Sequence, residues 1–327
     1  MKAFSRREFG KSVSAGALGG LAASSVAQVA QGQTSSPQSR QRPTAILREM
    51  IKSPGIITAP AIHDPITARM AESAGFQWVD VAGSALGEVT CITEPALSLE
   101  DMAAAIRHIT AAVNIPVTVD AGAGFGEPAH VAHTVQTLEH AGAAGMHIED
   151  QIYPKRFHYH IGVEHTIPAE AMVDKIHAAL EARRDPNFVV IARTDTIRTN
   201  SFAEGIRRAN LYAQAGADMI QLFPSTMEEA KRVPHEVHTP LNFVNGTGGT
   251  RPIIPAPELD AMGYKVLFVT GLTLASFKAA RDVLMNLKRT GNLGMDPTVY
   301  GPLSKELQEL IGLPHYIDIE NATTEKG

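Results

Sequence analysis

The sequence predicts a (β/α)8 barrel, an α/β fold in which eight parallel strands alternate with helices. Two observations support this prediction. Eight apolar runs recur between residues 55 and 271, with helical patterns between most of them. In addition, a helical pattern ending in Ala-Gly or Met-Gly and followed by an apolar run occurs four times. An open, doubly wound sheet is the alternative fold, because alternation alone does not show that the sheet closes.

The apolar runs are rich in β-branched residues and are too continuous for strands that are exposed on one face. They cover residues 55–59, 77–83, 116–121, 145–150, 188–194, 218–223, 240–245 and 265–271. Glycine just beyond a helix end adopts the left-handed conformation that caps the helix, which places each helix end before a strand. We expect the barrel to occupy residues 43–292 and a C-terminal helical extension and tail to occupy residues 293–327.

The N-terminus carries a targeting pattern. Arg6 and Arg7 form a twin-arginine pair, and a weakly apolar stretch rich in Ala, Gly and Ser follows. This arrangement predicts a twin-arginine export signal over residues 1–30, a disordered linker over residues 31–42 and a periplasmic protein that uses the twin-arginine export machinery. The stretch contains too many small and polar residues for a membrane span, so the mature chain is expected to have none.

Composition excludes several classes of function. The formal net charge of the 327 residues is −5, and the chain has no long basic run, which argues against a nucleic-acid partner. Cys91 is the only cysteine, so neither a disulfide within the chain nor a cysteine-built metal site is possible. The 44% hydrophobic content is ordinary for a globular enzyme.

Polar residues stand at the carboxyl ends of the predicted strands, where barrels carry their active sites. Asp120 ends the third strand, Glu149 the fourth and Arg193 the fifth. Mg²⁺ prefers oxygen ligands and commonly takes one or two carboxylates, so Asp120 and Glu149 are the candidate metal ligands. The alternative is that Asp120 caps the following turn and that Glu149 pairs with a basic residue.

An acidic substrate would fit the same rim. The Arg193 guanidinium can bind a carboxylate through two parallel hydrogen bonds, although a salt bridge that braces the barrel is the alternative role. Gly83 and Ser84, after the second strand, would offer backbone N–H groups to a carboxylate if they do not form a plain turn. The sequence thus favours a small carboxylate substrate.

Residues 151–170 form a connection of 20 residues, and loops of this length usually act as lids or binding loops. Its chemically active candidates are Lys155, His158, Tyr159 and His160. We expect Tyr159 or one of the histidines to transfer a proton. His158 and His160 would share a face of an extended segment, but a zinc site built from them lacks a third ligand.

Five stretches of the chain resemble the isocitrate lyase/phosphoenolpyruvate mutase superfamily: PGIITAPAIHDPITARMAESAGFQWVDVAGSALG, NIPVTVDAGAGFGEP, AGAAGMHIEDQIYPKR, PAEAMVDKIHAALEARRDPNFVVIARTD and ELQELIGLP. The similarity is greatest to its methylisocitrate-lyase-like and carboxyphosphonate-mutase-like branch and covers about residues 43–315. The resemblance implies a barrel whose last helix is often swapped between subunits, in a homodimer or homotetramer. It also implies Mg²⁺ and a small oxo or hydroxy acid that reacts through an enolate.

The resemblance assigns roles to individual positions. Asp120 falls on the metal-binding aspartate and Glu149 on a glutamate of the metal shell. Lys155 falls on the lysine that begins the gating loop. Substrate-contacting positions of the family fall on three residues: His147, Arg193 and Asn245.

The departures from the family pattern concern the same site. Gly122 and Thr93 stand where the family usually has acidic residues, which predicts weaker Mg²⁺ binding. The lid also lacks the cysteine that the lyase branch uses as a general acid. We therefore predict a metal-assisted carbon–carbon lyase acting on a small 2-oxo or 2-hydroxy acid. The alternatives are a phosphonopyruvate- or oxaloacetate-type hydrolase or mutase and a non-catalytic periplasmic carboxylate-binding barrel.

Overall fold

The computed structural model describes residues 41–246 and 251–324. The predicted export signal at residues 1–30 and nearly all of the predicted linker at residues 31–42 lie outside the described residues. Within them, no helix combines the length and the apolar character needed to cross a membrane.

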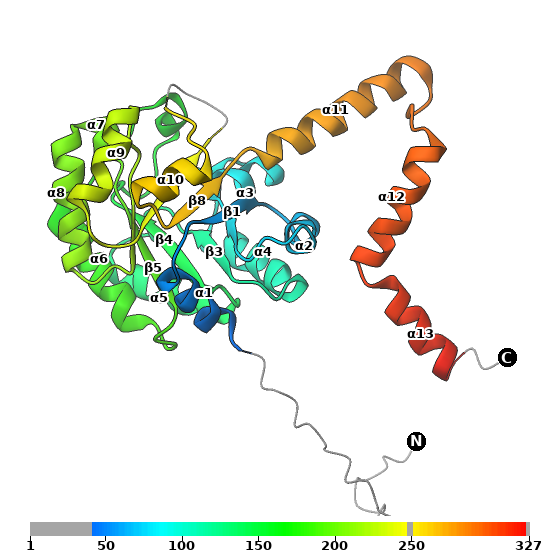
Figure 1. The fold of residues 1–327 in the computed structure, drawn as a ribbon, viewed down its shortest axis with the longest axis horizontal. Coiled ribbons are helices and arrows are strands. Elements are labelled where there is room, and N and C mark those ends of the chain that lie inside the picture. Colours follow the sequence, from blue (N-terminus) through cyan, green and yellow to red (C-terminus); the bar gives the residue numbers. More distant parts are fainter. Residues whose placement is uncertain (1–40, 247–250, 325–327) are drawn as a thin grey trace, which may run out of the picture. The chain divides into compact units, whose positions relative to one another are not determined.

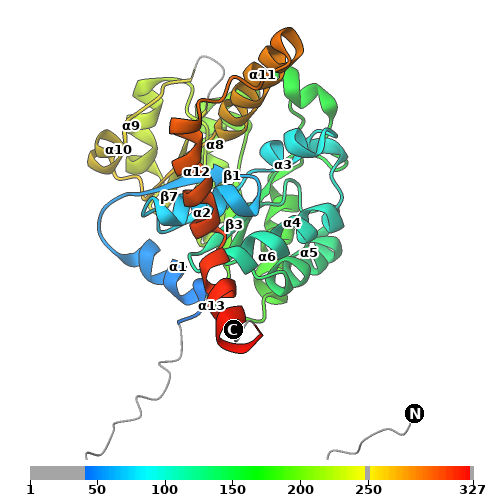
Figure 2. The ribbon, with the colours of Figure 1, turned by 90° about the vertical axis from the view of Figure 1, so that its right-hand side faces the viewer.

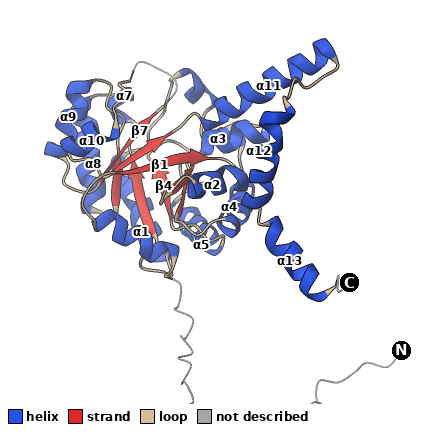
Figure 3. Cartoon of the chain, turned by 45° about the vertical axis from the view of Figure 1, so that its right-hand side comes forward, coloured by secondary structure: helices blue, strands red, loops and turns tan. Residues whose placement is uncertain are grey.

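Eight parallel strands form a closed barrel in the order of the chain (Figure 1, Figure 3). The strands are β1 (Ile57–Ile62), β2 (Val79–Val81), β3 (Val117–Asp120), β4 (Gly145–Glu149), β5 (Val189–Arg193), β6 (Met219–Gln221), β7 (Leu241–Asn245) and β8 (Val266–Val269). Each strand overlaps one of the eight predicted apolar runs. Pairing of β8 with β1, with Ile57 opposite Val266, closes the ring. The predicted (β/α)8 barrel is confirmed, and the open-sheet alternative is wrong.

Helices follow the strands and surround the barrel (Figure 2). Those that precede the last strand are α1 (Pro43–Lys52), α2 (Pro65–Ser73), α3 (Gly83–Thr90), α4 (Leu99–Ala112), α5 (Pro128–His140), α6 (Ala169–Ala182), α7 (Thr196–Thr199), α8 (Phe202–Gln214), α9 (Met227–Glu236) and α10 (Ala256–Met262). Local sequence explains several of their starts. Asp64 and Ser98 form capping boxes at the N-termini of α2 and α4, which satisfy backbone N–H groups that have no partner within the helix.

Both faces of the strands are buried, which explains their continuous apolar sequence. Val190 and Ala192 of β5 pack in the cluster that includes the surrounding helices, whereas Val189 and Ile191 belong to a second cluster with Trp78. The strands therefore form a rigid frame whose carboxyl ends hold the polar side chains described below.

The C-terminal part is helical and exposed. It contains α11 (Leu272–Thr290), α12 (Pro297–Leu310) and α13 (Leu313–Thr323), and α11 projects from the barrel in Figure 1. None of these three helices has a buried residue. Two hydrogen bonds join these helices to the barrel layer: the Thr273 hydroxyl of α11 donates to Glu88 of α3, and Arg69 Nη1 of α2 donates to the Leu310 carbonyl at 2.6 Å.

Candidate functional site

A cavity of about 170 Å³ lies at the carboxyl ends of the strands. Five of the predicted site residues line it: Ser84, Asp120, His147, Tyr159 and Arg193. The register of the barrel brings them together, because Asp120 of β3 lies opposite His147 of β4 and Glu149 of β4 lies opposite Arg193 of β5. A cavity of this size suits a small substrate.

Arg193 joins the two predicted metal ligands. Its Nη1 atom lies 3.3 Å from Asp120 Oδ2 and 3.0 Å from Glu149 Oε2. Asp195 binds the other side of the same guanidinium at 3.1 Å. Three carboxylates thus hold one buried guanidinium at the rim, with its position fixed before any substrate arrives.

The two candidate metal ligands differ in acidity. Burial alone would raise the pKa of Asp120, but the positive charges of Arg193, Lys155 and His147 outweigh it, so the pKa of Asp120 lies below its ordinary value. Burial raises the pKa of Glu149 to about 7, although Arg193 and Lys155 oppose the shift. Asp120 is therefore ionised at neutral pH. The pKa of Glu149 lies near neutral pH, so a cation bound close to it would favour the ionised form of its carboxyl group.

Asp120 and Glu149 fit a magnesium ion. Both oxygen atoms of the buried Glu149 carboxylate lack a hydrogen bond of good geometry among the described residues, although Lys155 Nζ and Arg193 Nη1 lie 2.9 and 3.0 Å away. Lys155 and Arg193 compensate the charge of these oxygen atoms, and a bound Mg²⁺ ion would supply the coordination that the geometry of the two ion pairs leaves incomplete. In the described chain no three His, Cys, Asp or Glu residues form a metal-binding group, so water and substrate would complete the coordination.

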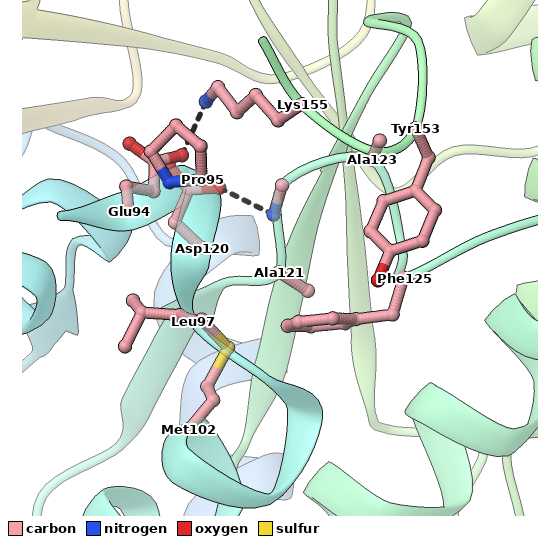
Figure 4. Close-up of a pocket in the computed structure, with 11 residues that line it drawn as sticks. Glu94, Pro95, Leu97, Met102, Asp120, Ala121, Ala123, Phe125, Tyr153 and Lys155 are labelled. Atoms are coloured by element: carbon pink, nitrogen blue, oxygen red, sulfur yellow. Dashed lines mark hydrogen bonds and ion pairs between the residues drawn. The ribbon is translucent and has the colours of Figure 1, made fainter. Parts of the chain in front are cut away.

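Glu94 supplies a carboxylate that the resemblance places at position 93. It lies in the 3-10 helix η1 (Glu94–Ala96), and its side chain is buried against Lys155 at the wall of a smaller pocket beside Asp120 (Figure 4). Gly83 makes room for it, since a Cβ atom there would lie 3.0 Å from Glu94 Cγ. Thr93 instead turns toward His160. The site is thus less depleted in carboxylates than the sequence suggests.

Lys155 bridges two carboxylates. Its ammonium group pairs with Glu94 and lies 2.9 Å from Glu149 Oε1. Burial would lower the pKa of Lys155, but Glu149 and Glu94 raise it above its ordinary value, so the group stays charged. The first residues of the predicted lid are therefore tied to the candidate metal site.

The middle of the lid is a 3-10 helix, η2 (Phe157–Ile161), and not an extended segment. The expectation that His158 and His160 share a face is wrong for this reason, since about three residues make one turn of such a helix. Both histidines are exposed, whereas Tyr159 lines the cavity and its ring lies 4.0 Å from Lys155 Nζ. Burial and Glu94 raise the pKa of Tyr159, so its phenol remains protonated and able to donate.

His147 lies between two partners that the sequence did not reveal. Its Nε2 atom is 3.0 Å from Asp80 Oδ1, and its Nδ1 atom is 2.8 Å from Gln221 Oε1. Because Asn242 Nδ2 donates to Gln221 Oε1, that oxygen is an acceptor and His147 Nδ1 carries hydrogen. Burial would lower the pKa of His147, but Asp80 raises it above its ordinary value. An aspartate inside the apolar run QWVDVAG is the signal that identifies Asp80.

Asn245 is not brought to the cavity. Its amide donates to the Ile254 carbonyl at 2.9 Å and accepts from the Ile254 N–H at 3.1 Å, so it braces the connection between β7 and α10. Other cavity residues escaped sequence analysis because they lie beyond the strand ends, either on loops or, for Arg198, in the short helix α7. They are Arg198, Phe223, Arg251 and Thr270. Their positions depend on the path of the loops.

Known proteins are similar to this chain in sequence and in fold. The chain is 37% identical over 256 residues to 2-methylisocitrate lyase of Aeropyrum pernix. This match covers 77% of this chain and 82% of the relative. It is 33% identical over 291 residues to 2,3-dimethylmalate lyase of Eubacterium barkeri, covering 85% of this chain and 96% of the relative.

Among solved structures, a phosphonopyruvate hydrolase complex with oxalate and Mg²⁺ superposes with a TM-score of 0.76 at 28% identity. The match covers 87% of this chain and 99% of that structure. The family model described as phosphoenolpyruvate phosphomutase matches residues 47–288. That segment contains the whole barrel and every candidate site residue. The chain therefore belongs to the phosphoenolpyruvate phosphomutase family.

Proposed function

We propose that the protein is a metal-assisted carbon–carbon lyase that acts on a small 2-oxo or 2-hydroxy acid through an enolate. The observation that carries this proposal is the convergence of Asp120, Glu149 and Arg193 at one rim of the barrel. Two relatives over most of the chain, 2-methylisocitrate lyase and 2,3-dimethylmalate lyase, are carbon–carbon lyases and support the reaction type.

Each residue of the site has a distinct role in the proposed reaction. Asp120 and Glu149 would hold Mg²⁺, which when bound polarises the oxygen atom next to the acid carboxylate. Arg193 binds the carboxylate, with help from backbone N–H groups at Gly83 and Ser84. Tyr159, protonated and facing the cavity, donates the proton that the lyase branch takes from a cysteine. Lys155 and the lid exclude water from the cavity.

A hydrolase or mutase acting on phosphonopyruvate or oxaloacetate is the second candidate. The superposition on phosphonopyruvate hydrolase supports it, as do the additional guanidinium groups of Arg198 and Arg251 at the cavity. Assays of oxaloacetate, phosphonopyruvate and 2-methylisocitrate side by side, with product analysis, separate these reactions. Binding of acids without turnover of any of them would instead indicate a carboxylate-binding barrel.

The decisive test of the proposed reaction is Asp120→Ala. Since Asp120 would hold the metal and also positions Arg193, we expect turnover to fall at least about a thousandfold. Circular dichroism and the melting temperature should show an intact barrel. Calorimetric titration with Mg²⁺ should show weakened metal binding. Unchanged turnover in the folded variant would contradict the proposal.

We further propose that the protein forms a homodimer or homotetramer in which the C-terminal helices pack against another subunit. The support is the exposed apolar surface of α11, α12 and α13, which includes Phe277, Leu284 and Leu303 at 61%, 61% and 48% exposure. Apolar patches of this extent on a soluble chain usually mark an interface.

Export through the twin-arginine route to the periplasm is the last part of the proposal. It is supported by Arg6 and Arg7 and by the apolar stretch that follows them. Replacing both arginines with lysine should leave the protein in the cytoplasm, whereas the wild-type protein should be recovered from the periplasm after osmotic shock. Equal export of the two proteins would contradict the assignment.

A further inference from the structure

Three arginine side chains surround one phenyl ring at the wall of the cavity. The guanidinium carbons of Arg193, Arg198 and Arg251 lie 4.6, 4.6 and 4.7 Å from the centroid of the Phe223 ring. All four residues line the same cavity. One ring stabilises a cation over its face, but three neighbouring guanidinium groups repel one another and therefore need counter-charges.

Two of the three arginines have their counter-charges in the protein. Arg193 pairs with Asp195 and with both candidate metal ligands, as described above. Arg198 pairs with Glu164 of the lid at 2.5 Å and with Asp195 at 2.6 Å. These two guanidinium groups are therefore positioned by carboxylates of the protein.

Arg251 has no such partner in the part of the chain that the structure describes. Among residues 41–246 and 251–324, no carboxylate lies within 4 Å of its guanidinium and no hydrogen bond uses it. Residues 247–250, which precede it, have the sequence TGGT and contain no acid. Burial and the two neighbouring guanidinium groups lower the pKa of Arg251 to about 10, so the group is still charged at neutral pH. A half-buried cation without an anion is costly, and a bound anion would remove that cost.

Arg251 also stands where a longer substrate would reach. It borders the cavity that contains Asp120 and Arg193, and it borders a neighbouring cavity of about 230 Å³ lined by Ser84 and Thr270 as well. Space therefore continues past Arg251. Asp195 and Glu164 act on its charge from a distance, and Glu88 lines the second cavity, but no described carboxylate forms an ion pair with it. A guanidinium in this position suits a planar carboxylate or a phosphonate, which it binds through parallel hydrogen bonds.

We propose that Arg251 selects substrates that carry a second anionic group, a carboxylate or a phosphonate, at the end remote from the carboxylate held by Arg193. The inference rests on the proposed function, because it presumes an acid in the cavity. It adds a specificity residue that lies outside the metal-binding and proton-transfer groups. Monoanionic acids of the same length would bind without using Arg251.

Two stable acids with the same four-carbon skeleton test this inference. Malate carries a carboxylate where 2-hydroxybutyrate carries a methyl group, and 3-phosphonolactate presents a phosphonate in a comparable place. With Mg²⁺ present, calorimetry on the wild-type protein should show malate or 3-phosphonolactate binding at least about tenfold more tightly than 2-hydroxybutyrate. Whichever of the two dianions binds more tightly identifies the group that Arg251 prefers.

Arg251→Met should remove most of that advantage. We expect the affinity for the preferred dianion to fall about tenfold or more and the affinity for 2-hydroxybutyrate to change less than twofold, since methionine keeps an apolar contact with Phe223 and removes the charge. Arg251→Lys keeps the charge and should retain part of the preference. The matched control is Arg232→Met, because Arg232 stacks on Phe202 at 4.3 Å outside the cavity and should affect neither affinity.

The outcomes separate the inference from the proposed function. Equal losses for the dianion and the monoanion, or no loss, in both Arg251 variants would overturn the role of Arg251 while leaving the lyase proposal standing. Failure of the wild-type protein to bind any of the three acids would overturn both. If Arg251→Met does not fold, as judged from its melting transition, Arg251→Lys alone decides the question. A partial loss of the preference for the dianion supports the inference, and an unchanged preference overturns it.

Discussion

Asp195 is the residue on which the charge balance of the rim depends most. It is fully buried, contacts Arg193 and Arg198 at 3.1 and 2.6 Å, and accepts a hydrogen bond of 2.7 Å from Gln151. Burial alone would raise the pKa of Asp195, but the two guanidinium groups and Gln151 lower it to about 2. Asp195 therefore positions Arg193 without contacting the substrate cavity itself.

This shift predicts a pH-dependent contribution to stability. Because the folded-state pKa of about 2 is below the ordinary value of 3.8, the stabilisation is fully present above pH 4 and is lost as the pH falls toward 2. The shift corresponds to roughly 2 kcal/mol. Asp195→Asn should lower the free energy of unfolding by at least that amount at pH 7, as measured by urea denaturation, because it leaves two guanidinium groups underpaired.

The pH profile checks the cause. The difference between Asp195→Asn and wild type should be constant from pH 8 to pH 5 and should shrink below pH 4. Asp282→Asn, which removes an exposed pair with Lys278, is the control and should change stability little. If the difference in the free energy of unfolding between Asp195→Asn and wild type stays constant down to the acid transition, the charge of Asp195 is not the cause of the stabilisation.

Residue patterns predict the part of the site that the strands position. Asp120, Glu149 and Arg193 could be found from the sequence because the carboxyl ends of neighbouring parallel strands meet at one rim. Arg251 could not, since it follows β7 by several residues and its place depends on the path of a connecting segment. The sequence pattern also placed Asn245 in the site wrongly, because a side chain at a strand end can turn toward the following loop and away from the cavity.

At the level of elements, the turn after β3 explains why a carboxylate is followed by so many small residues. The Gly122 N–H donates to Asp120 Oδ1 at 2.9 Å, and the Gly122 carbonyl accepts from the Glu149 N–H at 2.9 Å. Buried Lys175 of α6 donates to the Ala123 carbonyl at 2.9 Å. The turn therefore links both candidate metal ligands, and its small residues let backbone groups approach them closely.

Gly124 is a position in this turn where a side chain is poorly tolerated. Its φ of +78° favours glycine, and a Cβ atom would lie 2.6 Å from Val131 Cγ2 of α5. Gly124→Ala should therefore lower the free energy of unfolding by about 2 to 4 kcal/mol, from backbone strain and from the steric clash together. Chemical denaturation measures this change.

Gly55 provides the matched control for the turn. Its φ is +81°, nearly the same, but a Cβ atom there would have nothing within 4 Å. Gly55→Ala should cost about 1 kcal/mol from backbone strain alone. Equal costs at the two glycines would contradict the packing role assigned to Gly124.

The elements themselves were largely predictable, because helix, glycine and apolar run repeat along the chain and the pattern leaves few other folds. The lid was not. Residues 157–161 carry no pattern that distinguishes a 3-10 helix from an extended segment. Their conformation depends on contacts with the segment between β2 and α4, such as the contact of His160 with Thr93. Short segments without periodicity take their structure from the tertiary packing around them.

At the level of the whole molecule, the C-terminal helices pose the main question. In a closed barrel the helix after the last strand normally packs on the barrel surface, yet α11 has no buried residue. Apolar side chains on α11 to α13 include Phe277, Leu284 and Leu303, all about half-exposed or more. Covering them by a second copy of the chain would explain both facts.

We therefore expect a chain starting at residue 41 to run as a dimer or tetramer in size-exclusion chromatography with light scattering. The double variant Phe277→Glu/Leu284→Glu should shift it toward the monomer, because each substitution places a charge in an apolar interface. Lys278→Glu/Arg281→Glu changes the net charge on the same helix and removes no apolar group, so it should keep the wild-type assembly. A wild-type monomer at micromolar concentration would show that these helices pack in some other way.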